Sequence, residues 1–473
     1  MKRYLYAFFT ISLFAGCGIT KYETPKIDAP KATKSGVKYS LDDANLTQDA
    51  WWTKFNDEVL NQLVNDALKN NNQILAAKAN IDVATSKLKS SELSWLPTLA
   101  ASGSAFSGST IGSAITPKSA FGKTISQAGQ SQTTFSGYEG GFVPSYSVNI
   151  LANLSKTEIA KASLEMQIAT LNAVTLSVIS QTVGSYFMLL GQQNQLKLQK
   201  EIVADLEKLK ALEIIRSQNG KGDMQLLARL DAQILDAIAV LPQIKKAISQ
   251  TQNAIMVLLG KNPDILLTSA DINGLSTKNI VPPNIPSSVL KNRPDIIMAE
   301  AKLKTAYANL NLANSVFFPT ISLTGILGGA SMALSNLFTL GTGFWALQAA
   351  ASMPILNDSS FEDIKTAENG KYVAYYEYMQ SVKAAFANVD DALNNYEQNV
   401  LSCNNHLNSV YASQKAYKIA LSKYEAGAKD YRYAINQKLE LDNEMINLNF
   451  AKMAELDAVV GVYQALAGGY NIK

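Results

Sequence analysis

The stretch FFPTISLTG, Phe317–Gly325, decides how the rest of the chain is interpreted, because an earlier stretch repeats it. The earlier copy is WLPTLAASG, Trp95–Gly103, and its Pro97 lies 222 positions before Pro319. Both copies contain Pro-Thr-(Leu/Ile), then two variable residues, then Ser or Thr and Gly. A sequence motif repeated at this separation predicts two copies of one structural unit.

Further matches extend the repeat. Ile74 matches Ile296 at the same offset, and the segments Arg216–Asp223 (RSQNGKGD) and Lys423–Asp430 (KYEAGAKD) align at an offset of 207. The chain therefore consists of two copies of a unit of roughly 200 residues. The predicted division is a first repeat over 51–265, a linker over 266–290 and a second repeat over 291–473.

Composition limits the class of function. The 473 residues are 47% hydrophobic and 17% charged, with a formal net charge of +3. The low charge fraction argues against a disordered tail. Since no basic cluster stands out, we expect no nucleic-acid partner.

The N-terminus reads as a secretory signal peptide over residues 1–16. Lys2 and Arg3 supply positive charge, and Leu5–Phe14 forms a short apolar core. The following Leu-Phe-Ala-Gly-Cys ending at Cys17 resembles a bacterial lipobox, which predicts a covalent lipid on Cys17 and a polar tether over 17–50. Gly18 is not the aspartate of inner-membrane retention, so delivery to the outer membrane is favoured. The alternative is an ordinary signal peptide with an incidental cysteine.

Proline placement predicts long helices. Proline is absent between Pro144 and Pro242 and after Pro354, and an interior proline costs a helix about 3 kcal/mol. Apolar residues recur at helical spacing, which predicts rods of about 100 Å each. The predicted helices are listed by repeat: 72–95, 154–219 and 223–259 in the first, and 294–317, 359–426 and 430–468 in the second. Capping boxes at Ser155/Glu158 and Ser359/Glu362 are expected to start the long rods.

Two strand-like segments separate the short helix from the long rod in each repeat. We expect strands at about 97–106 and 142–151, and at about 319–329 and 344–355. Turns are expected at Gly141–Pro144 and Gly341–Gly343, with a surface loop over 107–140. Segments of about ten residues with alternating polarity are typical of membrane β-strands, although a small soluble sheet capping the helices would show the same periodicity.

A membrane sheet would require an oligomer. Hydrocarbon cannot satisfy the backbone groups of an open sheet edge, so a spanning sheet must close. Four strands per chain are too few, since the smallest spanning barrels have about eight. Several copies of the chain must then contribute to one barrel.

The ordered series of motifs resembles the outer membrane efflux proteins, the TolC-like outer membrane factors, and within them the lipoprotein branch. The resemblance covers about 51–470. It includes an opening helix at Trp51–Asn71, the stretch Arg293–Gly325, the segment Lys423–Glu444 and the ending Tyr463–Tyr470.

The resemblance implies a mainly α fold with a membrane β part, assembled as a homotrimer. Three protomers of four strands would share a 12-stranded β-barrel in the outer membrane of a Gram-negative bacterium, continued by a long periplasmic α-barrel. Pro97 and Pro319 would mark the junctions where a helix becomes a strand, since proline continues neither a helix nor a central ladder.

The function implied is that of a passive exit duct for drugs or other small toxic molecules. The expected partners are a periplasmic membrane-fusion adaptor and an inner-membrane transporter, of the RND type, and no cofactor is expected beyond the lipid on Cys17. Alternatives are a duct of the same fold for protein secretion or metal-ion export, and a lipid-anchored periplasmic coiled-coil protein that is no channel.

The resemblance also implies a periplasmic gate at the helix hairpin ends. The family's narrowing aspartate falls on Asn436 here, and the nearby constricting apolar position falls on Arg432. Asp223, Asp430 and Arg432 then either form an ion-pair latch or are merely solvated charges, worth about 0–1 kcal/mol a pair. Gly220 and Gly427 suit left-handed helix caps and are candidate adaptor contacts.

Catalysis is not expected. The chain has a single histidine, His406, so a histidine-based triad or metal site has almost nothing to work with. Asp390 and Asp391 are expected to be solvated charges on a helix, and Cys403 a small helix-packing residue. No phosphate-binding glycine motif is present. We therefore predict that the protein is not an enzyme and has no metal site.

Overall fold

The computed structural model describes most of the chain after the predicted signal peptide. The described residues are 20–26, 39–40, 46–110, 133–268, 270–282, 285–286 and 292–471. The predicted signal peptide and the lipidation site Cys17 lie outside them.

The chain divides into two compact units, and both sequence repeats contribute to each. The sheet unit comprises residues 1–22, 85–162 and 304–372, and the helical unit comprises residues 23–84, 163–303 and 373–473. The spatial division therefore does not follow the predicted boundary between repeats, because the longest helices each contribute residues to both units.

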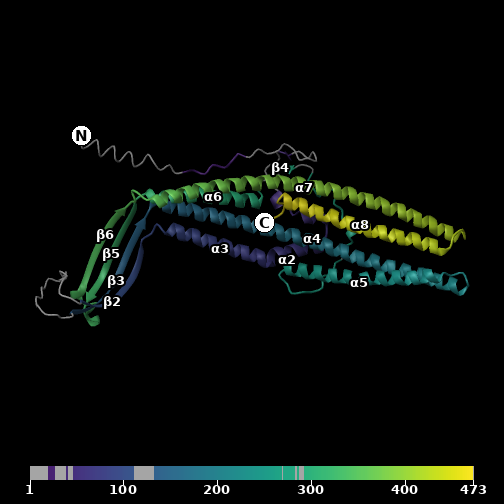
Figure 1. The fold of residues 1–473 in the computed structure, drawn as a ribbon, viewed down its shortest axis with the longest axis horizontal. Coiled ribbons are helices and arrows are strands. Elements are labelled where there is room, and N and C mark those ends of the chain that lie inside the picture. Colours follow the sequence, from purple (N-terminus) through teal and green to yellow (C-terminus); the bar gives the residue numbers. More distant parts are fainter. Residues whose placement is uncertain are drawn as a thin grey trace. The chain divides into compact units, whose positions relative to one another are not determined.

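Helices form most of the chain, and their order repeats (Figure 1). In the helical unit, α5 doubles back along α4 and α8 doubles back along α7 (Figure 1). The bounds in chain order are α2 Glu58–Asn70, α3 Asn72–Leu93, α4 Ile150–Gln218, α5 Met224–Leu258, α6 Pro294–Asn314, α7 Asp358–Glu425 and α8 Tyr431–Ala465. By length and composition α4 could cross a membrane, but 61% of its apolar window is buried inside the protein. Core packing explains its hydrophobicity.

The long rods do not start at the predicted capping boxes. α4 begins at Ile150, and Asn149 caps it by accepting the Ala152 N–H at 3.0 Å. Ser155 is buried inside the helix, and Glu158 pairs with Lys161 one turn on. The prediction was wrong because Asn149, six residues before Ser155, already accepts an amide of the first turn.

The second rod starts within one residue of its predicted start, but the predicted capping box does not form there either. α7 begins at Asp358, and the preceding Asn357 accepts the Ser359 hydroxyl at 2.8 Å through its side chain. Its carbonyl accepts the Ser360 N–H at 3.1 Å. Glu362 pairs with Lys365 instead of reaching back to the start.

The sheet unit contains one four-stranded antiparallel sheet in the order β2-β3-β5-β6 (Figure 1). Its strands are β2 Thr98–Thr110, β3 Thr133–Val148, β5 Thr320–Ser331 and β6 Gly343–Ser352. Pro97 lies between the end of α3 and the start of β2, and Pro319 lies between the short 3-10 helix η5 (Ser315–Phe317) and β5. Each copy of the repeated phrase therefore stands where helix gives way to strand.

The first hairpin departs most from the prediction. β3 starts nine residues before the expected 142, and β2 extends to Thr110. Of the expected loop over 107–140, residues 107–110 belong to β2 and 133–140 to β3, and residues 111–132 lie outside the described part of the chain. The expected turn at Gly141–Pro144 is wrong, because these residues pair within the sheet.

A close approach of two strands explains the glycine that misled this prediction. Gly141 of β3 lies opposite Gly328 of β5. A Cβ on Gly141 would lie 2.5 Å from the Leu327 carbonyl oxygen and 2.6 Å from the Gly328 Cα. The glycine is needed because the backbones nearly touch.

The two faces of the sheet differ in polarity. Residues on one face form apolar rows across the strands, such as Ala101, Phe142, Leu327 and Trp345. Phe142, Leu327 and Trp345 are each more than half exposed. On the other face, the row of Thr98, Ser145, Thr324 and Gln348 is polar, whereas the positions nearer to the Phe142 row are the apolar pairs Ala100–Val143 and Ile326–Ala346. The sheet thus has one exposed, mainly apolar face and one face of mixed polarity, and among the described residues its outer strands β2 and β6 each have one unpaired edge.

The helical unit has a packed aromatic core. Trp51 stacks on Tyr463 at 4.7 Å between ring centroids, with an interplanar angle of 6°. The predicted opening helix is in fact two elements, the 3-10 helix η2 Trp51–Phe55 and α2, separated by Asn56 at φ 55°. Asp57 caps α2 and also accepts the Tyr186 hydroxyl at 2.5 Å. These contacts fix the C-terminal half of α8 against α4.

Short elements join the predicted tether and linker. β1 (Tyr39–Ser40) pairs in parallel with β4 (Ile285–Pro286), and the 3-10 helix η3 (Ile272–Gly274) packs near α8. The tether is therefore attached to the helical unit through backbone pairing.

Candidate functional site at the helix hairpin ends

Both long hairpins of the helical unit turn at a glycine with left-handed backbone. Gly220 has φ 70° and Gly427 has φ 71°. At the first turn the Lys221 N–H donates to the Arg216 carbonyl at 2.9 Å, and an equivalent bond closes α7. A Cβ at either glycine would meet nothing within 4 Å, so the backbone angle is what calls for glycine. The predicted capping role is confirmed, and contact with an adaptor stays a prediction.

An aspartate restarts the helix after each turn. The Asp223 carboxylate accepts the N–H groups of Gln225 and Leu226 at 2.9 and 3.3 Å. Asp430 accepts the Tyr433 N–H at 3.3 Å. A carboxylate at this position satisfies amides at the positive end of the helix dipole.

Four charged side chains link the two hairpin ends. Arg432 of α8 donates to the Glu213 carboxylate of α4 at 3.0 Å and to Asp430 at 2.7 Å. Arg216 of α4 donates to the same Asp430 carboxylate at 2.9 Å. Arg216 also lies 3.7 Å from Glu213 on its own helix. The charges alternate, and two of these four contacts cross between the hairpins. We name Glu213, Arg216, Asp430 and Arg432 the tip cluster.

Glu213 is the buried member of the tip cluster. Its side chain is 1% exposed, against 27% for Arg432 and 42% for Asp430. It also accepts the backbone N–H of Asp223 at 2.8 Å, so one carboxylate holds both the first turn and α8. The hydrogen bond from Arg432 lowers the pKa of Asp430, and the same bond raises the pKa of Arg432. Asp430 and Arg432 are therefore both charged at neutral pH.

The structure rearranges the predicted gate. Asp430 and Arg432 do pair, but the Asp223 carboxylate caps α5 and does not join them. Asn436 is exposed on α8, and its side chain forms no hydrogen bond within the described residues. Glu213 was missed. Its position continues the buried spacing of Leu206 and Leu209 on α4, and a charge on an otherwise apolar stripe was the available signal.

A second polar contact lies further along the same two helices. Lys438 of α8 pairs with the fully buried Asp442 on its own helix and lies 3.7 Å from Asp205 of α4. Burial raises the pKa of Asp442, and one of its carboxylate oxygens has no hydrogen-bond partner in the described residues. Charged groups thus occupy a part of the α4–α8 contact where apolar residues could also pack.

A third polar contact involves Asn449 of α8. Its amide donates to the Gly191 carbonyl of α4 at 2.9 Å, and its carbonyl oxygen accepts from Asn194 at 2.9 Å. The α4–α8 contact is therefore polar at three levels, and between these levels Ile435 of α8 belongs to an apolar cluster with Leu206 and Leu209 of α4. Such bonds can be exchanged for bonds to water when helices separate, at a small net cost of about 1 kcal/mol each.

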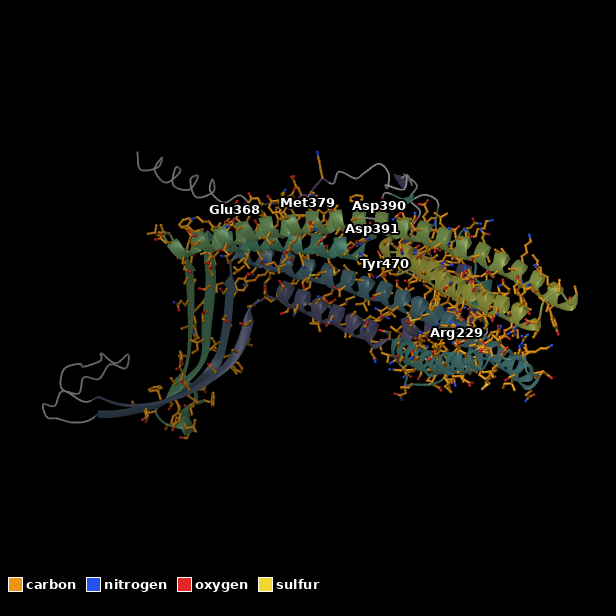
Figure 2. All side chains as sticks on the ribbon, turned by 45° about the vertical axis from the view of Figure 1, so that its right-hand side comes forward. Arg229, Glu368, Met379, Asp390, Asp391 and Tyr470 are labelled. Carbon is orange, nitrogen blue, oxygen red and sulfur yellow. The ribbon has the colours of Figure 1, made fainter. Side chains whose placement is uncertain are left out.

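The other residues singled out in the sequence lie on α7. Cys403 is buried there as predicted, while His406 is partly exposed. Figure 2 places Asp390 and Asp391 on the same helix, the first partly buried and the second exposed. Within the described part of the chain, no three His, Cys, Asp or Glu side chains are grouped to hold a metal ion.

The two most distinctive motifs contact each other. Arg293, which opens the stretch ending at Gly325, donates to the Ala465 carbonyl near the end of α8. Tyr470, labelled in Figure 2, donates its hydroxyl to the Asn292 carbonyl at 2.7 Å. These motif residues thus close the chain's end onto the start of α6, which gives them a structural role.

Comparison with known families identifies a match over most of the chain. The family model described as outer membrane efflux protein matches residues 63–261 and 285–468. These two segments correspond to the two repeats. Among curated proteins, the toluene efflux pump outer membrane protein TtgC of Pseudomonas putida is 26% identical, over 98% of this chain and 94% of the relative. A Salmonella typhimurium protein named "Probable outer membrane lipoprotein SilC" is 25% identical, over 98% and 97%.

Solved structures share the fold. The open state of the Neisseria gonorrhoeae MtrE outer membrane channel aligns with a TM-score of 0.81 and 23% identity, covering 96% of this chain and 98% of that one. The Campylobacter jejuni CmeC outer membrane channel aligns with a TM-score of 0.81 and 23% identity, covering 96% and 95%. At this identity the likeness establishes the TolC-like fold alone.

Proposed function

The chain belongs to the outer membrane efflux protein family, and from this premise we propose that three copies form a passive exit duct through the outer membrane of a Gram-negative bacterium. The duct serves an efflux system in which an inner-membrane transporter, of the RND type, and a periplasmic adaptor deliver the cargo. The protein itself catalyses no reaction.

One observation supports the proposal most strongly. The four-stranded sheet exposes an apolar face and leaves one edge of β2 and one edge of β6 unpaired. In hydrocarbon such edges must be paired, since unsatisfied backbone groups cost several kcal/mol each. β2 and β6 run antiparallel to each other, so β6 of one copy can pair with β2 of the next. Three copies close a barrel of twelve strands, which is within the known range.

The sheet face of mixed polarity then lines the passage. Thr98, Ser145, Thr324 and Gln348 would face water, and Phe142, Leu327 and Trp345 would face lipid. This is the expected alternation of a membrane barrel with an aqueous interior. A soluble capping sheet would instead bury its apolar face.

The tip cluster supports a gate at the periplasmic end. It holds α8 against α4 with charge-assisted bonds, so separating the hairpin ends requires those bonds to break together. An adaptor that binds the separated ends more tightly would shift the population towards an open state. Gly220 and Gly427 are the candidate contact points.

The lipid on Cys17 would anchor the assembly in the outer membrane. Substrates are proposed to be drugs or other small toxic molecules, as in relatives named for toluene and antibiotic efflux. Protein secretion, metal-ion export and a non-channel periplasmic role are the remaining candidates, and the experiment below separates the last of them.

Purified protein in detergent should run as a trimer on unboiled gels and as a monomer after boiling. The same material should give ion conductance in planar lipid bilayers. A delipidated chain that stays monomeric and soluble without detergent would overturn the proposal, because its exposed apolar sheet face would then tolerate water.

A further inference from the structure

The segment just after the predicted lipidation site is held on α6 by a matched pair of hydrogen bonds. The Thr20 backbone N–H donates to Asn311 Oδ1 at 3.0 Å, and Asn311 Nδ2 donates back to the Thr20 carbonyl at 3.0 Å. Both groups are partly buried. A side-chain amide suits this pair of bonds because it carries an acceptor oxygen and a donor nitrogen side by side.

An aromatic contact follows two residues later. The Tyr22 ring meets the Tyr307 ring of α6 edge to face, with centroids 5.6 Å apart and planes at 86°. The Lys304 ammonium lies 5.8 Å from the centre of the Tyr22 ring. Edge-to-face ring pairs and contacts between an ammonium group and an aromatic ring are both attractive.

The docked ring is also connected to the next helix. Lys371 of α7 lies 5.7 Å from the centre of the Tyr307 ring and 4.8 Å from that of Tyr372. Tether, α6 and α7 are thus joined within the sheet unit by alternating rings and ammonium groups. A polar tether without structure would show no such set of specific partners.

We propose that Asn311, Tyr307 and Lys304 form a dock for residues Thr20–Tyr22, which fixes the tether at the helix-to-strand junction. Asn311 lies one turn before the end of α6 at Asn314, and β5 starts at Thr320.

The dock determines where the lipid anchor acts. Three peptide units separate Cys17 from Thr20, which limits their separation to about 11 Å. This consequence rests on the proposed lipidation of Cys17 and on the membrane position of the strands. The lipid then enters the leaflet next to the barrel to which its protomer contributes. A force on the lipid is transmitted to α6 before it reaches the rest of the tether.

Hydrogen exchange of the N-terminal peptide tests the dock directly. The assembled protein is compared with Asn311→Leu, which keeps the size but removes both bonds, and with Asn311→Asp, which can accept but not donate. Asn309→Leu is the matched control, since Asn309 is exposed on the same helix. Losing two bonds of ordinary strength should speed exchange of the Thr20 amide by roughly tenfold or more.

The proposal expects fast exchange in Asn311→Leu, an intermediate rate in Asn311→Asp, and wild-type protection in Asn309→Leu. Equal exchange at Thr20 in the wild type and Asn311→Leu would overturn it. Trimer bands and conductance measured on the same samples report on the proposed duct separately. A Cys17→Ser variant shows whether protection of Thr20 persists without the lipid, as the dock requires.

Discussion

Glu213→Gln removes one negative charge from the buried end of the tip cluster and keeps the side chain's length and one acceptor. Glu213 accepts two short bonds, from Arg432 at 3.0 Å and from the Asp223 N–H at 2.8 Å. Bonds to a charged group contribute about 1.5–3 kcal/mol and neutral ones about 1. Arg432 keeps its bond to Asp430, so the substitution leaves no unpaired charge.

The expected loss is therefore smaller than for breaking an isolated buried pair. The partial exposure of Arg432 weakens the charge contribution further, which puts the loss at about 1–2 kcal/mol. Since every 1.4 kcal/mol is tenfold, the ratio of joined to separated hairpin ends should fall about five- to thirtyfold. In single-channel recordings from planar bilayers, Glu213→Gln should spend correspondingly more time in its high-conductance state.

Glu207→Gln is the control, because it is the same chemical change at an exposed position of α4. Arg432→Ala should also open the channel. The double variant Glu213→Gln/Arg432→Ala should destabilise the joined hairpin ends by less than the sum of the two single variants, since both substitutions remove the same hydrogen bond. If Glu213→Gln opens the channel no more than Glu207→Gln, and both melt at the wild-type temperature, the tip cluster does not hold the gate.

Three further predictions concern the turn, the sheet and pH. Arg432 lowers the pKa of Asp430, so the stabilisation from Asp430 should be constant above the ordinary aspartate pKa of about 4. It should be lost only as the pH falls through the lowered pKa of Asp430. Conductance measured against pH tests this, and opening of the channel between pH 8 and 5 would contradict it. Gly427→Ala should destabilise the α7–α8 hairpin by about 1–2 kcal/mol, because φ is positive there; a thermal melt no lower than the wild type refutes the strain. Leu327→Lys on the apolar sheet face should cost about 2–4 kcal/mol of membrane stability near the bilayer midplane, whereas Gln348→Lys on the other face should insert normally. Equal trimer yields for the two lysine variants would exclude the assigned faces.

The helices were predictable because their ends are marked chemically. The short helix of the second repeat was expected at 294–317, and it comprises α6 and η5 over the same residues. Pro294 can begin a helix without losing a hydrogen bond, and Gly427 can end one with a left-handed backbone. Such signals act within a few residues, so a single sequence is enough to interpret them.

The first hairpin was less predictable because its residues are small. The β2 residues 101–105 read Ala-Ser-Gly-Ser-Ala, which gives little contrast between faces. The glycine at Gly141 looked like a turn, but the chain needs it where two backbones nearly touch. That requirement comes from β5, more than 180 residues later, so local sequence could not show it.

The tip cluster was predictable in part for the same reason. Asp430 and Arg432 are neighbours in the sequence, and their pairing is local. Glu213 meets Arg432 across 219 positions, and that meeting depends on how α4 and α8 are rotated about their axes. Pattern reasoning identified Asp223 because it sits at a turn, yet helix capping uses its carboxylate first.

The distribution of contacts along α8 explains how one helix can be both anchored and movable. Its C-terminal half belongs to the aromatic core, where Tyr463 stacks on Trp51. Its N-terminal half is held to α4 by the tip cluster and by Lys438 near Asp205, together with a smaller apolar cluster around Ile435. Replacing buried ion pairs with apolar residues is often neutral or stabilising, so an interface built only for stability would not leave an oxygen of Asp442 without a hydrogen-bond partner among the described residues. Charge pairs do have one property that apolar packing lacks, because they can part and be solvated individually. The N-terminal half of α8 can therefore move while its C-terminal half stays fixed in the Trp51–Tyr463 core, and movement at the tips need not disturb that core.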